Sequence, residues 1–433
     1  MIHKKKLVGN HQGSVNKCQD DYEHKGYYKK YRKKFILLFT ILIACILIQN
    51  IHIAISARAS GKVYKITTST KPCDSSAKYT TYNKYTKHYY TLLSYLKKLE
   101  EEGGGTLELS KGTYTITNTL YVPSNVTIKL KDGVKIVKGK KSGTSKFTAS
   151  KSIFQFCGYS KSSKKGVYKK YNGESNISLI GEGTVSIDMN YDEDAVGIMM
   201  CHNRNIKITG ITFQNMYSGH FIEMDASKNV IVKNCTFKNH KDSYNNNKEA
   251  INLDTPDKST NGFHADWSSY DKTANENVII SNCTFKNLER SIGTHKYSQN
   301  ELHTNVQILN NTITNCDQDA IRIMNWKEPI IKGNTITNVG NKKNGLRAIL
   351  ISGVINPQIS DNLFKSVSRP IQIMPWKNIG DGDEYDIIYS FISDACIEIM
   401  KNNKLIDGDE YFIRYSKEYN EYKNNTEKIP LKS

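Results

Sequence analysis

The sequence predicts an all-β protein built as a parallel solenoid, in which short strands stack coil upon coil. Three observations lead to this prediction: a motif that recurs along the chain, a second strand pattern between its copies, and the alternation of apolar and polar residues in both. The recurring motif is seen in NVIVKNCTFKN, which begins at Asn229, and in NVQILNNTITN, which begins at Asn305. Its copies repeat with a period of about 24 residues, so we expect coils of about that length.

One column of the repeat, at the position before the Thr of the motif, contains an isoleucine followed by cysteines and then asparagines. The aligned residues are Ile211, Cys235, Cys283, Asn311, Asn334 and Asn362. Because a solenoid coil buries its apolar face only against its neighbours, this column is predicted to lie in the interior. We therefore interpret Cys235 and Cys283 as buried thiols and not as metal ligands.

The N-terminal 59 residues predict export from the cytoplasm. Residues 1–34 contain ten Lys or Arg and three Asp or Glu, a net charge of +7, and an apolar stretch follows them. This order is typical of a signal peptide in residues 35–59, and the same stretch is long enough for an uncleaved membrane anchor. A lipid on Cys45 is a further alternative, because LIAC resembles a bacterial lipobox. We expect residues 1–34 to stay in the cytoplasm and the rest to be secreted or anchored, with membrane contact only through this segment.

The remaining chain divides into three predicted parts. Residues 60–84 are rich in Thr, Ser, Lys and Tyr without a period and are expected to be a tether. Residues 85–378 are expected to form the solenoid, which begins with a capping helix whose leucines have helical spacing. Residues 379–433 lose the repeat and are expected to cap the C-terminal end.

Two segments resemble a known group of proteins. GGGTLELSKGTYTI begins at Gly103 and LYVPSNVTIKLKDGVKI begins at Leu120, and the coils of the repeat follow them. Together they resemble the pectin-lyase-like superfamily over about residues 85–378. The resemblance implies a right-handed parallel β-helix and an extracellular protein directed at polysaccharides. It does not select a reaction, because the superfamily includes lyases, hydrolases, epimerases, esterases and adhesins.

The alternation of side chains predicts where a functional site lies. In the strand AINLD, Ile251 and Leu253 are predicted to point inward, while Asn252 and Asp254 point outward. The same register gives one outward column with Glu223, Asn252, Gly293, Arg322, Leu350 and Gln372. The second outward column contains Asp225, Asp254, His295, Met324, Ser352 and Met374. Neighbouring coils lie about 4.8 Å apart, so the charged members should form one patch over four coils.

The longest insertion of the chain, Thr255–Glu276, begins directly after Asp254. Long loops in compact repeats are often functional, and aromatic residues beside polar groups suit stacking against a sugar ring. The insertion is therefore predicted to form the wall of a glycan-binding cleft. The predicted substrate-binding residues are Trp267, Tyr270, Asn252 and Lys296, and the predicted catalytic residues are Asp254, His295, Arg322, Asp266 and His264.

Two reactions suit this patch. In β-elimination, Ca²⁺ held by Asp225, Asp254 and Glu223 would neutralise a uronate carboxylate, and a histidine would act as the base. In hydrolysis, two carboxyl groups would act on the glycosidic bond. The order NLD…HAD…GTH…RI is similar to the NTD…DD…GHG…RIK series of polygalacturonases, although Lys296 and Met324 depart from it.

The sequence thus predicts an exported enzyme that cleaves an acidic polysaccharide. The alternative is a non-catalytic adhesin or wall-associated protein that binds a glycan on the cell surface. A net charge of +12 outside residues 1–34 favours an acidic partner. Nucleic acid is not expected, because no Lys/Arg stripe is interleaved with aromatic residues on one element. We expect a monomer, and the nine scattered cysteines do not suggest a disulfide framework.

Overall fold

The computed structural model describes residues 61–242, 248–340, 346–377, 386–419 and 426–432. The chain divides into two units, Met1–Ala57 and Arg58–Ser433. The first unit, with the predicted signal peptide or anchor and Cys45, lies outside the described residues. Across the described ranges, no helix is both long and apolar enough to cross a membrane.

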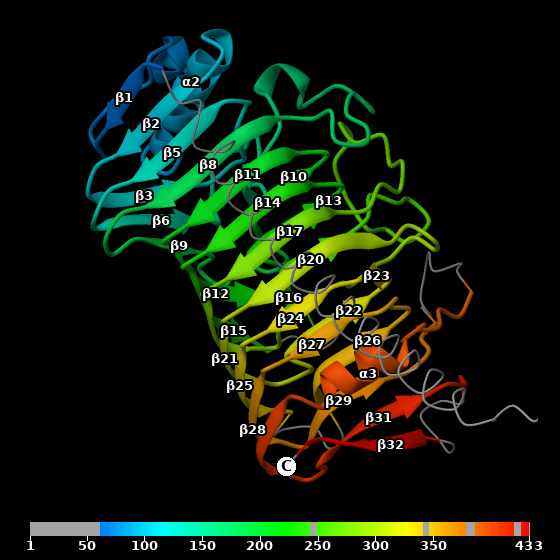
Figure 1. The fold of residues 1–433 in the computed structure, drawn as a ribbon. Helices are drawn as coiled ribbons and strands as arrows, with labels where there is room; N and C mark the ends of the chain where they lie inside the picture. The colour runs from blue at the N-terminus through cyan, green and yellow to red at the C-terminus, as the bar shows by residue number, and fades with distance from the viewer. Residues whose placement is uncertain (1–60, 243–247, 341–345, 378–385, 420–425, 433) are drawn as a thin grey trace, which may run out of the picture. The chain divides into compact units, whose positions relative to one another are not determined.

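The second unit consists of three β-sheets whose strands are stacked in chain order, as the colours of Figure 1 show. The first sheet contains β1 (Val63–Ile66), β2 (Gly105–Leu109), β5 (Val126–Leu130), β8 (Ser175–Gly181), β11 (Arg204–Thr209), β14 (Lys228–Lys233), β17 (Glu276–Ser281), β20 (His303–Leu309), β24 (Ile330–Lys332) and β27 (Gln358–Ser360), with β23 (Trp326–Lys327) beside β20. The second contains β3 (Gly112–Ile116), β6 (Val134–Lys138), β9 (Ser186–Asp188), β12 (Thr212–Tyr217), β15 (Thr236–Lys241), β18 (Thr284–Leu288), β21 (Thr312–Cys316), β25 (Thr335–Val339), β28 (Leu363–Val367) and β30 (Lys404–Gly408). The third contains β4 (Leu120–Tyr121), β7 (Ser152–Gln155), β10 (Val196–Cys201), β13 (Ile222–Asp225), β16 (Glu249–Asp254), β19 (Arg290–Gly293), β22 (Ile321–Met324), β26 (Arg347–Ser352), β29 (Arg369–Ile373), β31 (Phe412–Ser416) and β32 (Thr426–Pro430).

Each complete coil contributes one strand to each sheet, and equivalent residues of successive coils pair in register. The predicted outward columns are confirmed where strands pair, since Glu223 is opposite Asn252 and Asp225 is opposite Asp254. Inward positions form ladders of like side chains. The rings of Phe213, Phe237 and Phe285 stack with centroids 5.0 and 4.9 Å apart in the core. This arrangement is a parallel β-helix.

The predicted interior column is confirmed and continues one coil further than the sequence suggested. Cys235 and Cys283 are buried, and Asn311, Asn334 and Asn362 form a buried ladder that ends at Asn403. The side-chain oxygen of each Asn accepts from the backbone N–H of the column residue one coil before, at 2.9 Å from Cys283 to Asn311 and at 2.9 Å from Asn311 to Asn334. The side-chain amide of Asn334 donates to the Ile308 carbonyl at 2.9 Å. The ladder therefore satisfies backbone groups at a corner where strand pairing is interrupted.

The predicted capping helix is α2 (Lys87–Glu101), which packs on the first coil against β2, β3 and β4. Its buried residues include Leu92, Leu93, Leu96 and Leu99. The expected tether of residues 60–84 is not a free linker. It contains β1, which pairs in parallel with β2, and the short helix η1 (Ser75–Lys78). One strand of four residues is too short to show a period in the sequence, so the tether prediction was wrong for this part.

The C-terminal boundary also lies later than residue 379. Strand β30 pairs with β28 and β31 pairs with β29, so two sheets of the solenoid continue beyond that point. Helix α3 (Asp394–Met400) packs against β27, and β32 closes the third sheet by pairing antiparallel with β31. The repeat is hard to recognise in the sequence here because a long segment separates β29 from β30. This segment contains α3 and residues 378–385, which lie outside the described structure.

The Asn ladder predicts that replacing Asn334 by Ala destabilises the protein by roughly 2–4 kcal/mol, because buried donors and acceptors lose their partners. Chemical denaturation of the full chain measures this difference. Thr312→Ala, on an exposed position of β21, is the matched control and should change the free energy of unfolding by less than about 0.5 kcal/mol. Equal stabilities of the two variants would show that the ladder is dispensable.

Candidate functional site

A cleft of about 270 Å³ lies over strands β10, β13 and β16 of the third sheet. The insertion after β16 forms one side of the cleft, and the turn after β19 borders it. The lining residues are Asp194, Val196, Met199, Ser218, Gly219, His220, Glu223, Lys248, Asn252, Asp254, Asn261, Gly262, Phe263, His264, His295 and Lys296. Six of the predicted site residues line this cleft, which lies where the outward columns and the insertion predicted a site.

Glu223 is a buried carboxyl group in the cleft with an unusual protonation state. Its Oε1 accepts from the side-chain amide of Asn252 at 3.0 Å, and its Oε2 lies 3.4 Å from Nε2 of His220. Burial, reinforced by the charge of Asp254, raises the pKa of Glu223 to about 8. The Nδ1–H of His220 donates to the Glu249 carbonyl, so Nε2 carries a lone pair. A proton on Glu223 is what this pair of facing atoms requires.

Asp254 lies one rung further along and is held differently. Strand β19 ends at Gly293, and the turn that follows directs the backbone N–H groups of His295 and Lys296 at Asp254 Oδ1, at 2.7 and 2.8 Å. Hydrogen bonds of this kind favour the ionised carboxylate. Burial is the larger effect and raises the pKa of Asp254 to about 7. Asp254 therefore exchanges its proton near neutral pH.

Asp225 lies behind these two groups and does not line the cleft. It is fully buried, and neither carboxyl oxygen has a hydrogen-bond partner among the described residues. Burial and then the charges of Glu223 and Asp254 raise its pKa well above the usual range. The three carboxyl groups expected to hold Ca²⁺ are thus groups that bind protons tightly, and a cation would compete with those protons. The Ca²⁺ site stays a prediction.

Arg322 occupies a different position from the one expected. It was predicted to be a catalytic residue of the outward patch. Its Nη2 instead lies 2.9 Å from Oε1 of buried Glu249 and donates to Nδ1 of His295 at 3.2 Å. Arg322 is buried and is absent from the cleft lining, so its contacts are with Glu249 and His295 and not with the cleft.

His295 takes its tautomer from this contact. Because a guanidinium can only donate, Nδ1 of His295 accepts, and Nε2 is the nitrogen that carries hydrogen. Burial and then the charges of Lys248 and Arg322 lower the pKa of His295 well below its usual range. His295 is a neutral imidazole beside the cleft and can donate a hydrogen bond to a ligand there.

Glu249 belongs to a buried charge column that sequence reasoning missed. Glu249 is paired in register with Arg290, and Asp319 lies 3.6 Å from Arg290 and 2.9 Å from Arg347. All four residues are buried. Although burial acts in the opposite direction, Arg322 and Arg290 lower the pKa of Glu249, so its charge persists. The signal was present in the sequence, because the four residues stand two positions before aligned inward isoleucines and alternate in sign.

The insertion is anchored by the residues that were expected to bind sugar. Trp267 is 1% exposed and packs edge-on against Tyr168 and Phe263. Its Nε1–H donates to Oε1 of Gln155 at 3.1 Å. The prediction that Trp267 stacks on a substrate is wrong, because the aromatic face is used to fasten the loop to residues 155–168. Tyr270 is partly buried beside this cluster and does not line the cleft.

The tip of the insertion supplies the residues that do face the cleft. His264 is exposed and lines it, whereas Asp266 is exposed and does not. Asp266 is therefore not positioned with the other predicted catalytic residues. His220 and Lys248 were not among the predicted site residues, yet both line the cleft. His220 directly precedes the strand that carries Glu223, and this adjacency could have identified it.

Comparison with known proteins supports the fold. No protein-family profile matches the sequence. Plasmin and fibronectin-binding protein A of Streptococcus pneumoniae (strain ATCC BAA-255 / R6) is 26% identical over 250 residues, which cover 54% of this chain and 34% of that protein. The chain therefore spans about a third of the length of this curated relative.

Two solved structures of PfbA, a surface adhesin of Streptococcus pneumoniae, are similar in fold. Their TM-scores are 0.55 and 0.54 at 20% and 19% identity, over 76% and 75% of this chain and 84% and 75% of theirs. At this identity the similarity establishes the fold alone. The chain has the right-handed parallel β-helix fold that the resemblance to the pectin-lyase-like superfamily implied.

The packing of Trp267 predicts that Trp267→Ala lowers the free energy of unfolding by about 3 kcal/mol, because a large buried side chain is removed. Chemical denaturation of the full chain provides the measurement. His264→Ala, at an exposed position of the same insertion, is the control and should be within about 0.5 kcal/mol of the wild type. A Trp267→Ala protein as stable as this control would restore the original stacking interpretation.

The raised pKa of Glu223 predicts that stability falls as pH rises from about 4.5 to about 8. Below this window the Glu223 carboxyl is protonated in both the folded and the unfolded chain. Within the window only the unfolded chain ionises it, so the free energy of unfolding decreases. Glu223→Gln should be more stable than the wild type at pH 8, by a margin on the order of 3 kcal/mol, and equal to it near pH 4. Thermal melts across this range test the sign. Glu301→Gln, an exposed control, should follow the wild type.

Proposed function

We propose that the protein is an extracellular carbohydrate-active enzyme that cleaves an acidic polysaccharide by general acid–base catalysis in this cleft. The observation that carries the proposal is the pair of buried carboxyl groups, Glu223 and Asp254, on adjacent rungs of one cleft. Their pKa values are raised to about 8 and about 7. Carboxyl groups poised near neutral pH inside a cleft are typical of acid–base sites.

The two carboxyl groups have different surroundings, which suggests different roles. Glu223 faces the lone pair of a neutral His220 and keeps its proton, so it would protonate the leaving glycosidic oxygen. Asp254 is stabilised in its ionised form by two backbone N–H groups and would act as the base or nucleophile. Hydrolysis needs two such groups. β-Elimination remains an alternative in which Asp254 removes the proton at C5 of a uronate.

The cations of the cleft support an acidic substrate. Lys248 and Lys296 line it together with the carboxyl groups, and His295 offers an N–H donor. A uronate carboxylate could lie against these side chains while the glycosidic bond meets Glu223. In this proposal the lysines recognise the carboxylate, whereas Arg322 is paired with Glu249.

A surface adhesin is the second candidate, favoured by the similarity to plasmin and fibronectin-binding protein A. That relative's name describes binding to two host proteins, and its solved structures are described as those of a surface adhesin. In such a protein the cleft would bind a ligand without cleaving it, and the raised pKa values would follow from burial alone. Extracellular exposure of the β-helix is common to both candidates.

The proposal is tested by incubating the full chain with a panel of uronic and neutral polysaccharides and measuring cleavage. Release of reducing ends reports cleavage, and ultraviolet absorbance of an unsaturated product separates β-elimination from hydrolysis. We expect cleavage of a uronic polysaccharide, and a loss of at least about 100-fold in Glu223→Gln and Asp254→Asn, as removal of an acid or base catalyst causes.

Glu276→Gln is the matched control, because Glu276 pairs with Lys228 on the first sheet, away from the cleft. It should retain wild-type activity. Cleavage that persists in both cleft variants would remove the catalytic assignment. No cleavage of any glycan, combined with saturable binding to plasmin or fibronectin, would favour the adhesin.

A further inference from the structure

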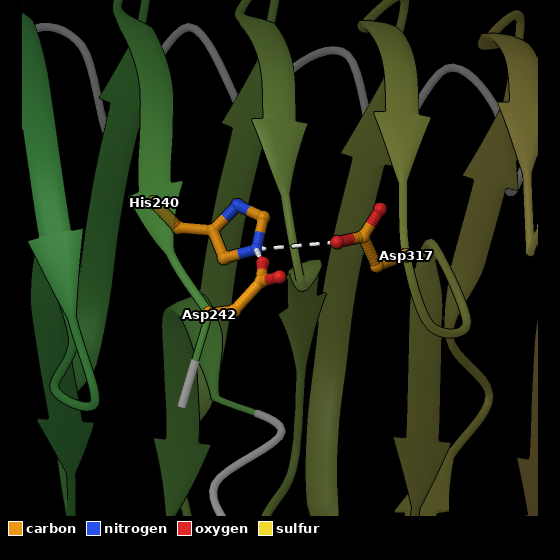
Figure 2. Close-up of side chains that lie close together, drawn as sticks. All are labelled: His240, Asp242 and Asp317. Carbon is orange, nitrogen blue, oxygen red and sulfur yellow. Dashed lines mark ion pairs between the residues drawn. The ribbon is translucent and has the colours of Figure 1, made fainter. Parts of the chain in front are cut away.

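Three side chains that the proposed function does not use converge at one end of the second sheet. His240 is near the end of β15, Asp242 follows that strand, and Asp317 follows β21, two rungs further on. Nε2 of His240 lies 3.1 Å from Oδ1 of Asp242 and 3.3 Å from Oδ2 of Asp317. Figure 2 shows the imidazole edge directed at both carboxyl groups. One nitrogen and two oxygens, all within 4.8 Å of one another, thus face a common point.

The other side of the imidazole ring is fixed by the rung between them. Nδ1 of His240 lies 2.9 Å from the backbone carbonyl of Asn287 on β18. A carbonyl can only accept, so Nδ1 carries the hydrogen and Nε2 of the neutral ring presents its lone pair. A backbone carbonyl that holds Nδ1–H in this way is the usual companion of a histidine that binds metal through Nε2.

The environment of Nε2 adds to this geometry. The His240 side chain is 8% exposed, and its buried Nε2 faces the two carboxyl groups at 3.1 and 3.3 Å. A lone pair that faces two carboxylates is electrostatically unfavourable unless a cation lies between them. Either a proton on His240 or a metal ion would supply that charge.

We propose that Nε2 of His240 and the carboxylates of Asp242 and Asp317 bind one divalent transition-metal cation of the Zn²⁺ class. Bonds of about 2.0–2.1 Å in a tetrahedron separate ligand atoms by roughly 3.3 Å, and the two distances from Nε2 agree with such edges. An imidazole ligand favours this class over Ca²⁺ and Mg²⁺, which prefer oxygen alone. Three protein ligands leave the fourth position for water.

The position of the site indicates a structural role. The cation would join the ends of β15 and β21 across β18 and so fasten three successive coils on the second sheet. Strand pairing stops at this end of the sheet, and Asp317 is already attached through its backbone N–H to the Leu288 carbonyl at 3.0 Å. This site on the second sheet is separate from the cleft of the proposed catalysis, which lies on the third sheet.

Isothermal titration of the metal-free, untagged full chain with Zn²⁺ tests the proposal. We expect one equivalent to bind, a rise in melting temperature with Zn²⁺, and visible absorption of a tetrahedral site when Co²⁺ replaces it. His240→Gln and Asp242→Asn should each weaken binding at least about tenfold. The Asp242 side chain is 79% exposed, so Asp242→Asn should fold and give a usable test even if His240→Gln is unfolded.

Asp361→Asn is the matched control for loss of a carboxylate. Asp361 has a positive φ of 57°, like Asn234, Asn282 and Asn310 at the equivalent turns, so Asn is accommodated there. This variant should bind Zn²⁺ as the wild type does. The proposal would be overturned if the wild-type chain bound no Zn²⁺, or if the Asp242→Asn variant bound Zn²⁺ with the same affinity as the wild type. The arrangement would then be a protonated His240 between two carboxylates.

Discussion

The in-register pairing of successive coils is the constraint on which this structure depends. Each side chain lies about 4.8 Å from its counterpart on the next coil, so each position must hold a side chain that is like its neighbour or complementary to it. Apolar columns then give the stacked Phe213, Phe237 and Phe285, and amide columns give the buried Asn ladder. The same geometry forces charged residues into ladders, where like charges must share protons and unlike charges pair.

The cleft follows from this constraint. Glu223 and Asp254 approach each other because their strands pair in register, and the insertion then removes them from water. Burial with a neighbouring carboxyl group is the combination that raises a carboxyl pKa most strongly. The buried column from Glu249 to Arg347 shows the opposite outcome, in which alternating signs keep the charges ionised. One architecture thus produces both a protonated site and a permanent ion network.

The fold could be predicted from the sequence because the recurring motif and the alternation of apolar and polar residues are both periodic. The repeat predicted the solenoid, the interior column and the outward positions of Asn252 and Asp254, all of which the register confirms. It could not show where the insertion folds, since a loop without a period gives no register. Trp267 was therefore predicted to bind sugar although it is buried. Arg322 was predicted to be catalytic because its partner, Glu249, lies in an inward column where the sequence pattern predicts apolar side chains.

The proposed acid–base function depends most on a carboxyl group of Glu223 that keeps its proton at neutral pH. Carbon-13 NMR of the full chain labelled at glutamate carboxyls, titrated from pH 4 to pH 9, observes that proton directly, and Glu223→Gln identifies the resonance. We predict one glutamate carboxyl with a pKa of about 8, which is absent from the variant. A Glu223 resonance that titrates near its ordinary value of 4.5 would contradict the protonated pair and the acid–base function built on it.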